Sequence, residues 1–354
     1  MPLLARMIES PLSVDIRHGA IDKLADLLAD GRISTGGRVA IAVGPGLGDE
    51  LMEILTPQLA QADIFRVRDG SVDRARELAN SVRESFYDAI VGIGGGRTID
   101  VAKYAASLAG VPMVTVATSL AHDGLASPVA SLEHNGRKGS YGVHIPIAVI
   151  ADLDYVARSP LRWLRAGVGE ALSNLSALRD WWLAHEHRGS AVDGLATAFA
   201  RCGGEAVLHH GESVESEDFL GLLAEALVLS GLAMSVAGTS QPCSGACHEI
   251  SHAVDARYSV DGRHGEQVAV GALFASYLRN DGSAAPLDAA LRRHGVPRLP
   301  ADIGLTTEQF CDVVAAAPAT RPDRYTILEH LALDEAEIRN RVDDFLETFD
   351  RAAA

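Results

Sequence analysis

The sequence predicts two domains in tandem, a Rossmann-like α/β domain with a parallel sheet followed by an all-helical domain. The chain has 354 residues and is 47% hydrophobic, which is enough to fill two cores of ordinary size. Its first 155 residues alternate between short apolar runs and helix-like segments, as expected for a parallel sheet covered by helices. Strand-like patterns stop after about Pro160. We therefore place the two domains at residues 1–158 and 159–354.

The predicted strands of the first domain are short apolar runs that end at glycine or proline, or where helical spacing begins. They cover residues 38–43, 63–67, 89–93, 111–117 and 145–150. Helical patterns follow the first strand through Leu59, cover 73–84, and follow the third strand through Leu108. Fully apolar strands separated by helices predict a doubly wound parallel sheet.

The second domain shows helical spacing almost throughout, with glycine or proline at most junctions. The predicted helices cover residues 165–188, 191–210, 217–237, 245–258, 265–280, 286–295, 306–317 and 334–352.

Composition excludes several classes of partner. The formal net charge is −16 and no long run of Lys and Arg occurs, so we expect no nucleic-acid partner. No stretch reaches the roughly 18 apolar residues of a membrane span, and the N-terminus lacks a signal-peptide pattern. None of the four cysteines forms a CxxC pair. We expect a cytoplasmic protein with reduced cysteines.

A glycine-rich turn is the first chemical signal. The strand at 89–93 runs into Gly94, Gly95 and Gly96, and a helix follows. Glycines let the backbone approach a diphosphate closely, and the free N–H groups of the helix face the anion. The spacing is not GxGxxG, but the flanking patterns favour a nucleotide site over a plain tight turn. Asp100 and Lys103 lie on the first turns of this helix, where solvated or capping roles are the alternative.

Two further loops are candidates for ligand contact. A second glycine-rich turn, residues 44–48, follows the first strand. It carries Gly44 where an acidic residue would favour NAD over NADP, so the cofactor preference stays open. Hydroxyl side chains and an Asp-Gly turn follow the strand at 111–117, within residues 118–128. This pattern is typical of a ligand-lining loop and equally of an ordinary turn.

Three histidines and one carboxylate have the pattern of a metal site. His248 and His252 stand at i and i+4 and share one helix face, and His264 begins the next helix. Glu170 lies near the start of the first helix of the second domain. Two histidines and a carboxylate from separate helices, with one position left for substrate, are typical of catalytic Zn²⁺ or Fe²⁺.

The segment from His248 to His252 also reads HExxH, the zinc motif of a peptidase in which Glu249 would be the general base. A metzincin would need a third histidine at position 258, which is Tyr258. The α/β-then-helical layout does not favour a peptidase either. Ordinary surface histidines are the remaining alternative.

Five motifs in a fixed order resemble the sn-glycerol-1-phosphate dehydrogenase family over nearly the whole chain. They read GGGRTIDVAK, TSLAHDGLASP, AGVGEALSN, SQPCSGACHEISHAVD and HGEQVAVG. This family is related to glycerol dehydrogenase, iron-containing alcohol dehydrogenases and dehydroquinate synthase. The resemblance implies a metal-dependent oxidoreductase that uses NAD or NADP with Zn²⁺, or alternatively Fe²⁺. Its substrate would be a small polyol or polyol phosphate and the matching ketone, such as dihydroxyacetone phosphate. We also expect a homo-oligomer.

The resemblance assigns roles to individual residues. Cofactor contacts are implied at Gly94, Gly95, Gly96, Arg97, Thr98, Thr118, Ser119 and Ser127, and we add Asp100 on the same helix. Asp123 would hold the substrate. Glu170, His248 and His264 would bind the metal, with His252 near the substrate as a proton relay. The 16-residue step from His248 to His264 matches dehydroquinate synthase, which favours His264 over His252 as a ligand.

Three residues depart from the family pattern. Glu170 stands where the family usually has Asp, Gln241 where it has Arg, and Cys247 where it has Glu. Cys247 is either a metal ligand or a small packed side chain. Glu170 favours an alternative, a cyclase or lyase like dehydroquinate synthase that reduces and reoxidises NAD within one cycle. The HDGxxSP loop favours the dehydrogenase.

Overall fold

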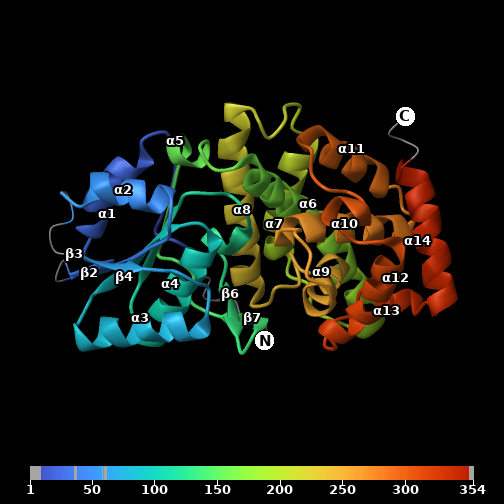
Figure 1. The fold of residues 1–354 in the computed structure, drawn as a ribbon, viewed down its shortest axis with the longest axis horizontal. Helices are drawn as coiled ribbons and strands as arrows, with labels where there is room; N and C mark the ends of the chain where they lie inside the picture. Colours follow the sequence, from blue (N-terminus) through green and yellow to red (C-terminus); the bar gives the residue numbers. More distant parts are fainter. Residues whose placement is uncertain (1–8, 36–37, 58, 60–61, 351–354) are drawn as a thin grey trace, which may run out of the picture. The chain divides into compact units, whose positions relative to one another are not determined.

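The computed structural model describes residues 9–35, 38–57, 59 and 62–350. The chain divides into two compact units, Met1–Pro160 and Leu161–Ala354 (Figure 1). The first contains a six-stranded sheet and the second is helical, so the predicted fold class is confirmed.

All six strands of the sheet are parallel, in the order β1-β8-β5-β4-β2-β3. They are β1 (Ser13–Arg17), β2 (Val39–Val43), β3 (Ala62–Arg66), β4 (Ala89–Gly94), β5 (Met113–Ala117) and β8 (Ala148–Asp152). In the central strands, Val43 is opposite Ile93 and Gly94 is opposite Ala117. The glycine-rich turn therefore leaves the sheet at its carboxyl edge, beside the end of β5.

Helices cover both faces of this sheet, as a doubly wound fold requires. On one face Ile41, Val91 and Val116 form a single core cluster with residues of η1 (Ala20–Lys23), α1 (Leu24–Leu28) and α2 (Leu47–Leu55). On the other face lie α3 (Val72–Glu84) and α4 (Gly96–Ala109) (Figure 1). A Cβ on Gly92 would lie 2.9 Å from Ala102 Cβ, so α4 packs directly on β4.

The sequence patterns missed three strands. The edge strand β1 reads SVDIR, and β6 (Val129–His134) pairs with β7 (Arg137–Gly142) in an antiparallel hairpin. Asn135 and Gly136 both have positive φ at its turn, as a two-residue hairpin turn requires. These strands are short and partly polar, so they lack the apolar run that marks a buried strand.

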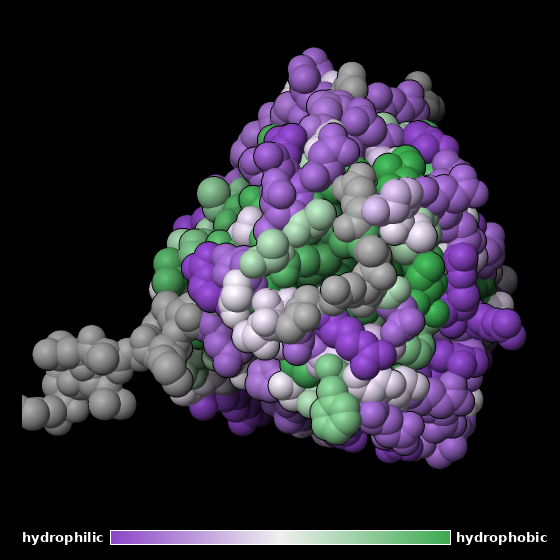
Figure 2. All heavy atoms as spheres, turned by 90° about the vertical axis from the view of Figure 1, so that its left-hand side faces the viewer, coloured by the Kyte–Doolittle hydropathy of each residue, from purple (hydrophilic) through white to green (hydrophobic). Residues whose placement is uncertain are grey.

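At the opposite sheet edge, Ile64 of β3 is 43% exposed, and hydrophobic surface is visible at this end in Figure 2.

A buried ion pair fastens the hairpin to α4. Lys103 is 0% exposed, and its Nζ lies 3.2 Å from Asp100 Oδ1 and 3.3 Å from the Ser127 carbonyl, to which it donates. Asp100 Oδ2 accepts a hydrogen bond from the Ser131 amide at 3.1 Å. A solvated role for Asp100 and Lys103, the alternative from the sequence, is therefore wrong. Two buried groups of opposite charge hold the loop at 118–128 against the helix.

The second unit consists of helices joined by short connections. They are α6 (Leu161–Arg188), α7 (Gly194–His209), α8 (Glu217–Ala237), α9 (Ala246–Arg257), α10 (His264–Arg279), α11 (Ala284–His294), α12 (Thr307–Ala316), α13 (Ile327–Leu331) and α14 (Glu335–Asp350). The sequence missed α13 and the 3-10 turn η4 (Ala317–Thr320). It also began α6 four residues late, so Glu170 lies within this helix rather than near its start.

One helix has the length and apolar composition of a membrane span. It is α8, in which the window Asp218–Ala237 is long and apolar enough to cross a membrane. Length and composition alone are weak evidence for a membrane span, because the core helices of soluble proteins share both properties. Here 61% of the window is buried within the protein. A Cβ on Gly203 of α7 would lie 2.9 Å from the Ala226 carbonyl oxygen, so α8 packs tightly on its neighbour. It has the packing of a core helix.

Replacing Lys103 with Met should leave the Asp100 carboxylate buried without its cation. Breaking a buried pair in this way costs about 3 kcal/mol. We expect urea unfolding to show a loss of about that size in the free energy of unfolding. The matched control is Lys23→Met at the end of η1, whose side chain is 64% exposed and pairs with Asp26 at the surface, so its replacement should change stability by less than about 0.5 kcal/mol. Equal effects of the two changes would contradict this role of Lys103.

Candidate functional site

The three residues proposed as metal ligands come from three helices and converge. Glu170 lies on α6, His248 on α9, and His264 is the first residue of α10. Each offers one donor atom, and these atoms lie within 4.8 Å of one another. Glu170 Oε1 is 3.8 Å from His248 Nε2, and Glu170 Oε2 is 3.8 Å from His264 Nε2. Around a tetrahedral zinc ion, donor atoms lie about 3.4 Å apart, so the spacing suits a divalent metal.

Small residues beside the ligands let the three helices approach closely. A Cβ on Gly265 would lie 1.9 Å from the Ala166 carbonyl oxygen, and one on Gly169 would lie 2.2 Å from the Gly265 carbonyl oxygen. A Cβ on Gly271 would lie 2.8 Å from the Cys247 carbonyl oxygen. Because no side chain fits at these crossings, the backbones of α6, α9 and α10 are in direct contact. We name this arrangement, centred on Gly169, Gly265 and Gly271, the glycine crossing.

Charged side chains of α6 fix the starts of α9 and α10. Asp180 Oδ2 accepts a hydrogen bond from the Ala246 amide at 2.9 Å, which caps α9 two residues before His248. Arg162 of α6 forms a bidentate pair with Glu266, at 2.8 and 2.9 Å, two residues after His264. Each histidine therefore lies two residues from a backbone or side-chain group that a hydrogen bond holds in place.

The site favours neutral imidazoles, the form that binds metals. Burial lowers the pKa of His248 to about 3, and the positive charges of Arg321 and Arg324 lower it further. His264 Nδ1 lies 3.1 Å from Ser251 Oγ, and that hydroxyl donates to Gln267 Oε1 at 2.7 Å. Ser251 Oγ therefore accepts from the Nδ1–H of His264, which turns the lone pair of Nε2 toward Glu170.

Glu170 itself fits a bound cation. Its side chain is 5% exposed, and Oε2 is buried without a hydrogen-bond partner among the described residues. A buried carboxylate oxygen without a donor is costly unless a positive charge compensates it. A metal ion between Glu170, His248 and His264 would provide that charge.

His252 lies beside this triad and not within it. Its ring centroid is 6.4 Å from that of His248 and 6.5 Å from that of His264, whereas the latter two are 5.1 Å apart. Burial lowers the pKa of His252 to about 3, and the positive charge of Arg321 is the second cause of this lowering. The arrangement is compatible with a position near the substrate, which remains a prediction.

Glu249 is poorly placed to be the base of a peptidase. It is 1% exposed, and its Oε2 accepts a hydrogen bond from Thr326 Oγ1 at 3.0 Å. Burial raises its pKa to about 9, and the nearby charge of Glu329 raises it as well. A protonated, enclosed carboxyl cannot take a proton from water at neutral pH, and the metal triad uses His264 in place of His252. Both observations argue against the peptidase interpretation.

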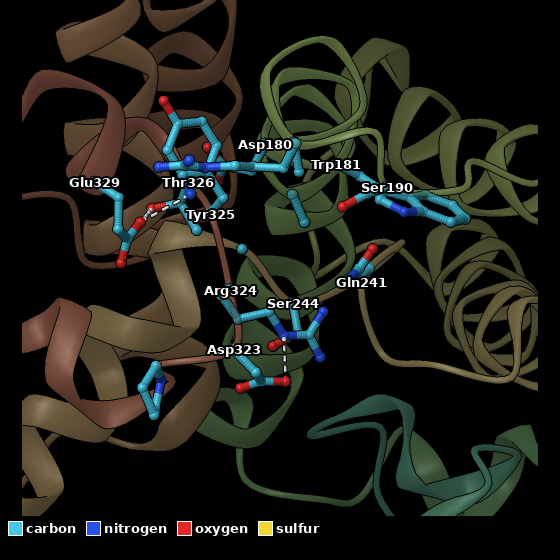
Figure 3. A pocket seen from close by; sticks show the side chains of 15 residues that line it. Asp180, Trp181, Ser190, Gln241, Ser244, Asp323, Arg324, Tyr325, Thr326 and Glu329 are labelled. Carbon is cyan, nitrogen blue, oxygen red and sulfur yellow. Dashed lines mark hydrogen bonds and ion pairs between the residues drawn. The ribbon is translucent and has the colours of Figure 1, made fainter.

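Of the residues that depart from the family pattern, Cys247 contacts a proposed metal ligand and Gln241 lines a cavity. Cys247 is 0% exposed, its Sγ is 3.3 Å from His248 Nδ1, and burial raises the pKa of its thiol to about 12. It is a neutral, packed thiol, since a metal-bound cysteine must be a thiolate. Gln241 lines a cavity of about 380 Å³ together with Asp180, Arg188 and Arg324 (Figure 3).

In the first unit, the predicted nucleotide residues gather at the carboxyl edge of the sheet. Gly95 caps α4 without a side chain, so no side-chain hydrogen bond closes its N-terminus. The Thr118 amide donates to the Gly94 carbonyl at 3.0 Å, and Ser119 Oγ lies 3.1 Å from where a Cβ on Gly95 would be. The end of β5 is therefore next to the glycine-rich turn. This turn has the form of an anion-binding helix start.

The other predicted residues of the first unit differ in exposure. Thr98 is 3% exposed, and its Oγ1 lies 2.3 Å from where a Cβ on Gly44 would be, so an acidic side chain would not fit there. Arg97 is exposed and Asp123 is half-buried at the start of η2 (Asp123–Leu125). Ser127 is 1% exposed, and its Oγ lies 3.5 Å from Lys103 Nζ. It therefore belongs, with Asp100, to the buried ion-pair cluster that fastens the hairpin to α4, which we call the hairpin anchor.

His122 was not assigned from the sequence. Its Nδ1 accepts a hydrogen bond from the Gly124 amide at 2.8 Å, and its Nε2 lies 1.6 Å from where a Cβ on Gly96 would be. The imidazole therefore covers the glycine-rich turn. The residue stands inside the motif TSLAHDGLASP, but only the folded loop brings it to Gly96.

Comparison with known proteins gives consistent matches. Residues 15–160 match the family model described as iron-containing alcohol dehydrogenase. The chain is 35% identical to a glycerol-1-phosphate dehydrogenase [NAD(P)+] of Hyperthermus butylicus, over 91% of this chain and 93% of the relative. It is 33% identical to the enzyme of the same name from Methanosarcina mazei, over 94% and 95%.

Solved structures share the fold across both units. A probable glycerol dehydrogenase from Sinorhizobium meliloti superposes with a TM-score of 0.78 at 23% identity, covering 99% of this chain and 100% of that one. Glycerol dehydrogenase from Schizosaccharomyces pombe gives 0.78 at 19% identity, covering 99% and 93%.

Replacing Gly265 with Ala should force α6 and α10 apart at the glycine crossing. The added Cβ would overlap the Ala166 carbonyl oxygen, which belongs to backbone and cannot rotate away. We expect a loss of at least about 2 kcal/mol in the free energy of unfolding, together with loss of metal measured by elemental analysis. Gly194→Ala, at an exposed helix start with open space, is the control and should change neither quantity. Full metal content in the Gly265→Ala protein would argue against the crossing.

Replacing Glu249 with Gln should stabilise the protein, and more so at higher pH. The pKa of Glu249 is raised in the fold to about 9 from 4.5, so the folded state holds a proton that the unfolded state releases above pH 4.5. The stability that the Glu249 carboxyl contributes is fully present below pH 4.5 and is lost as pH rises toward 9. By pH 7 the wild type has lost about 3 kcal/mol of unfolding free energy in this way. The difference in unfolding free energy between variant and wild type should therefore grow between pH 5 and 8, without loss of metal. A constant difference would show that Glu249 is already ionised.

Proposed function

This chain belongs to the glycerol-1-phosphate dehydrogenase family of iron-containing alcohol dehydrogenases, and on that premise we propose that it is an NAD(P)-dependent, metal-dependent polyol-phosphate dehydrogenase. The proposed reaction interconverts a glycerol-1-phosphate-like substrate and a ketone such as dihydroxyacetone phosphate. The convergence of Glu170, His248 and His264 is the observation that carries the proposal, because their three donor atoms, within 4.8 Å of one another, could hold a divalent metal.

We assign nucleotide binding to the first unit and metal and substrate binding to the second. When bound, a Zn²⁺ or Fe²⁺ ion supplies Lewis acidity toward the substrate oxygen, and the nicotinamide supplies or accepts the hydride. Glu170 contributes the negative charge of the ligand set, and the two neutral imidazoles keep the net charge of the site positive. A positive site would favour an alkoxide-like substrate oxygen.

The glycine-rich turn is proposed to bind the diphosphate of the nucleotide. Gly94, Gly95 and Gly96 admit the phosphates to the backbone, and the uncapped start of α4 offers N–H donors. Thr98, Thr118 and Ser119 line the same edge of the sheet, and Arg97 is exposed beside it. Asp100 and Ser127 support this site indirectly, since their side chains are engaged in the hairpin anchor.

Two residues are proposed to act on the substrate. Asp123 lies in the loop that follows β5, half-buried, and would hold substrate hydroxyl groups. His252 would relay the proton, since its ring lies beside those of His248 and His264, at centroid distances of 6.4 and 6.5 Å.

The names of the relatives favour this dehydrogenase over a cyclase like dehydroquinate synthase. The two functions differ in redox balance. A dehydrogenase consumes one reduced nicotinamide for each ketone, whereas a cyclase restores its NAD within the cycle and gives no net change.

We further propose that the protein is a cytoplasmic homo-oligomer. None of the four cysteines forms a disulfide bond, in keeping with a reducing compartment. The exposed apolar side chains of the sheet edge, such as Ile64, offer surface for self-association. Light scattering of the purified protein would report its oligomeric state.

Replacing Glu170 or His264 with Ala should remove metal and turnover together, because either change deletes one of three ligands. We expect the oxidation of NADH or NADPH by dihydroxyacetone phosphate, followed at about 340 nm, to fall by at least about 100-fold. His209→Ala, an exposed histidine on α7, is the control and should keep both metal and activity.

Two outcomes would contradict the proposal. Full turnover after complete metal removal would refute the metal-dependent reaction. Wild-type protein that binds the ketone phosphate but gives no net oxidation of either nucleotide would refute the dehydrogenase.

A further inference from the structure

Two arginines converge on one hydroxyl group in the segment that joins η4 to α13. Arg324 Nη2 donates to Ser240 Oγ at 2.8 Å, and Arg321 Nη1 lies 3.4 Å from the same oxygen. The Arg324 side chain is only 9% exposed, and Arg321 is half-buried. Two like charges held this close together and away from water are costly unless an anion lies nearby.

The protein supplies too little negative charge to neutralise this arginine pair. Within the part of the chain that the structure describes, the one carboxylate at ion-pair distance of either guanidinium is Asp323, 4.0 Å from Arg324 Nε and itself 78% exposed. Arg324 Nε and Nη1 are buried and have no hydrogen-bond partner among the described residues. Among the described residues the nearby buried carboxyl of Glu249 forms no ion pair with either arginine, and its Oε2 accepts a hydrogen bond from Thr326 Oγ1 at 3.0 Å. Unused donors and uncompensated charge both call for an anionic ligand.

The arginine pair lies next to the metal triad. Ser240 lies in the loop between α8 and α9, the helix that carries His248. Thr320 Oγ1 lies 3.4 Å from the Glu249 carbonyl oxygen on α9, a contact that ties the arginine segment to this helix. The charge of Arg321 acts on both His248 and His252. Arg324 also lines the cavity with Gln241 and Ser244, and its side chain lies beside Ser244 in Figure 3. An anion bound here would be accessible from the cavity and close to the metal site.

We propose that Arg321 and Arg324, with the Ser240 hydroxyl, bind the phosphate group of the substrate. This inference rests on the proposed function and specifies how that site selects phosphorylated polyols. Each guanidinium presents a planar set of donors that matches two phosphate oxygens, and a dianion would neutralise both cations at once. The pair also accounts for Gln241, which stands where the resembling family carries an arginine: the positive charge for the phosphate comes from positions 321 and 324.

The test compares a phosphorylated with an unphosphorylated ketone in single and double variants. Arg321→Gln and Arg324→Gln should each lower kcat/KM for dihydroxyacetone phosphate by about 10- to 100-fold, mainly through KM, and the double variant by more than either. Values for dihydroxyacetone should change by less than about threefold. Arg188→Gln is the matched control, since Arg188 lines the same cavity but stacks on Tyr325 at 4.5 Å. It should leave the preference for phosphate unchanged.

A binding measurement separates this inference from the proposed function. Inorganic phosphate, titrated calorimetrically into the metal-loaded protein, should bind the wild type and the Arg188→Gln variant but not the double variant. If the wild type binds phosphate in this way yet reduces no ketone, the arginine site stands and the proposed function fails. If the wild type reduces dihydroxyacetone phosphate, and the folded double variant keeps the wild-type KM and phosphate affinity, the inference is overturned. Thermal unfolding and metal content verify that the double variant is folded.

Discussion

The candidate metal centre depends on backbone contact between three helices. At the glycine crossing, a single methyl group on Gly169 or Gly265 would overlap a carbonyl oxygen of the facing helix. The ligands Glu170 and His264 immediately follow and precede these glycines, so the distance between the ligands is set by the distance between the helix axes. Side chains that bind metal well elsewhere would not converge here on helices of ordinary spacing, which lie about 8–10 Å apart.

Burial around the crossing sorts the charges of the second unit. His248 and His252 are neutral because low polarity and the neighbouring arginines lower their pKa, and Glu249 is neutral because the same burial raises its pKa. Glu170 is left to face a cation, and Arg321 and Arg324 are left to face an anion. A metal ion and an anionic substrate would therefore complete a charge balance that the protein alone leaves open.

The sequence was most informative where one element carries its own signal. Apolar runs and helical spacing located the central strands and most helices, whereas β7 reads RKGSYG and forms through pairing and the Lys103 anchor. The metal residues came from the resemblance and from histidine spacing. The supports of the site were not predictable, because Arg162 meets Glu266 and Asp180 meets Arg279 about a hundred residues apart in sequence. The proposed role of Arg321 and Arg324 could not be predicted either, because it depends on their burial and on the few carboxylates around them, which only the folded structure gives.

The glycine crossing also bears on how the protein would acquire its ion. Close backbone packing brings the donors of Glu170, His248 and His264 together, so the ligand set follows from how the three helices pack. Its imidazole and carboxylate donors accept several first-row metals, so cellular supply would decide the occupant as much as the protein does.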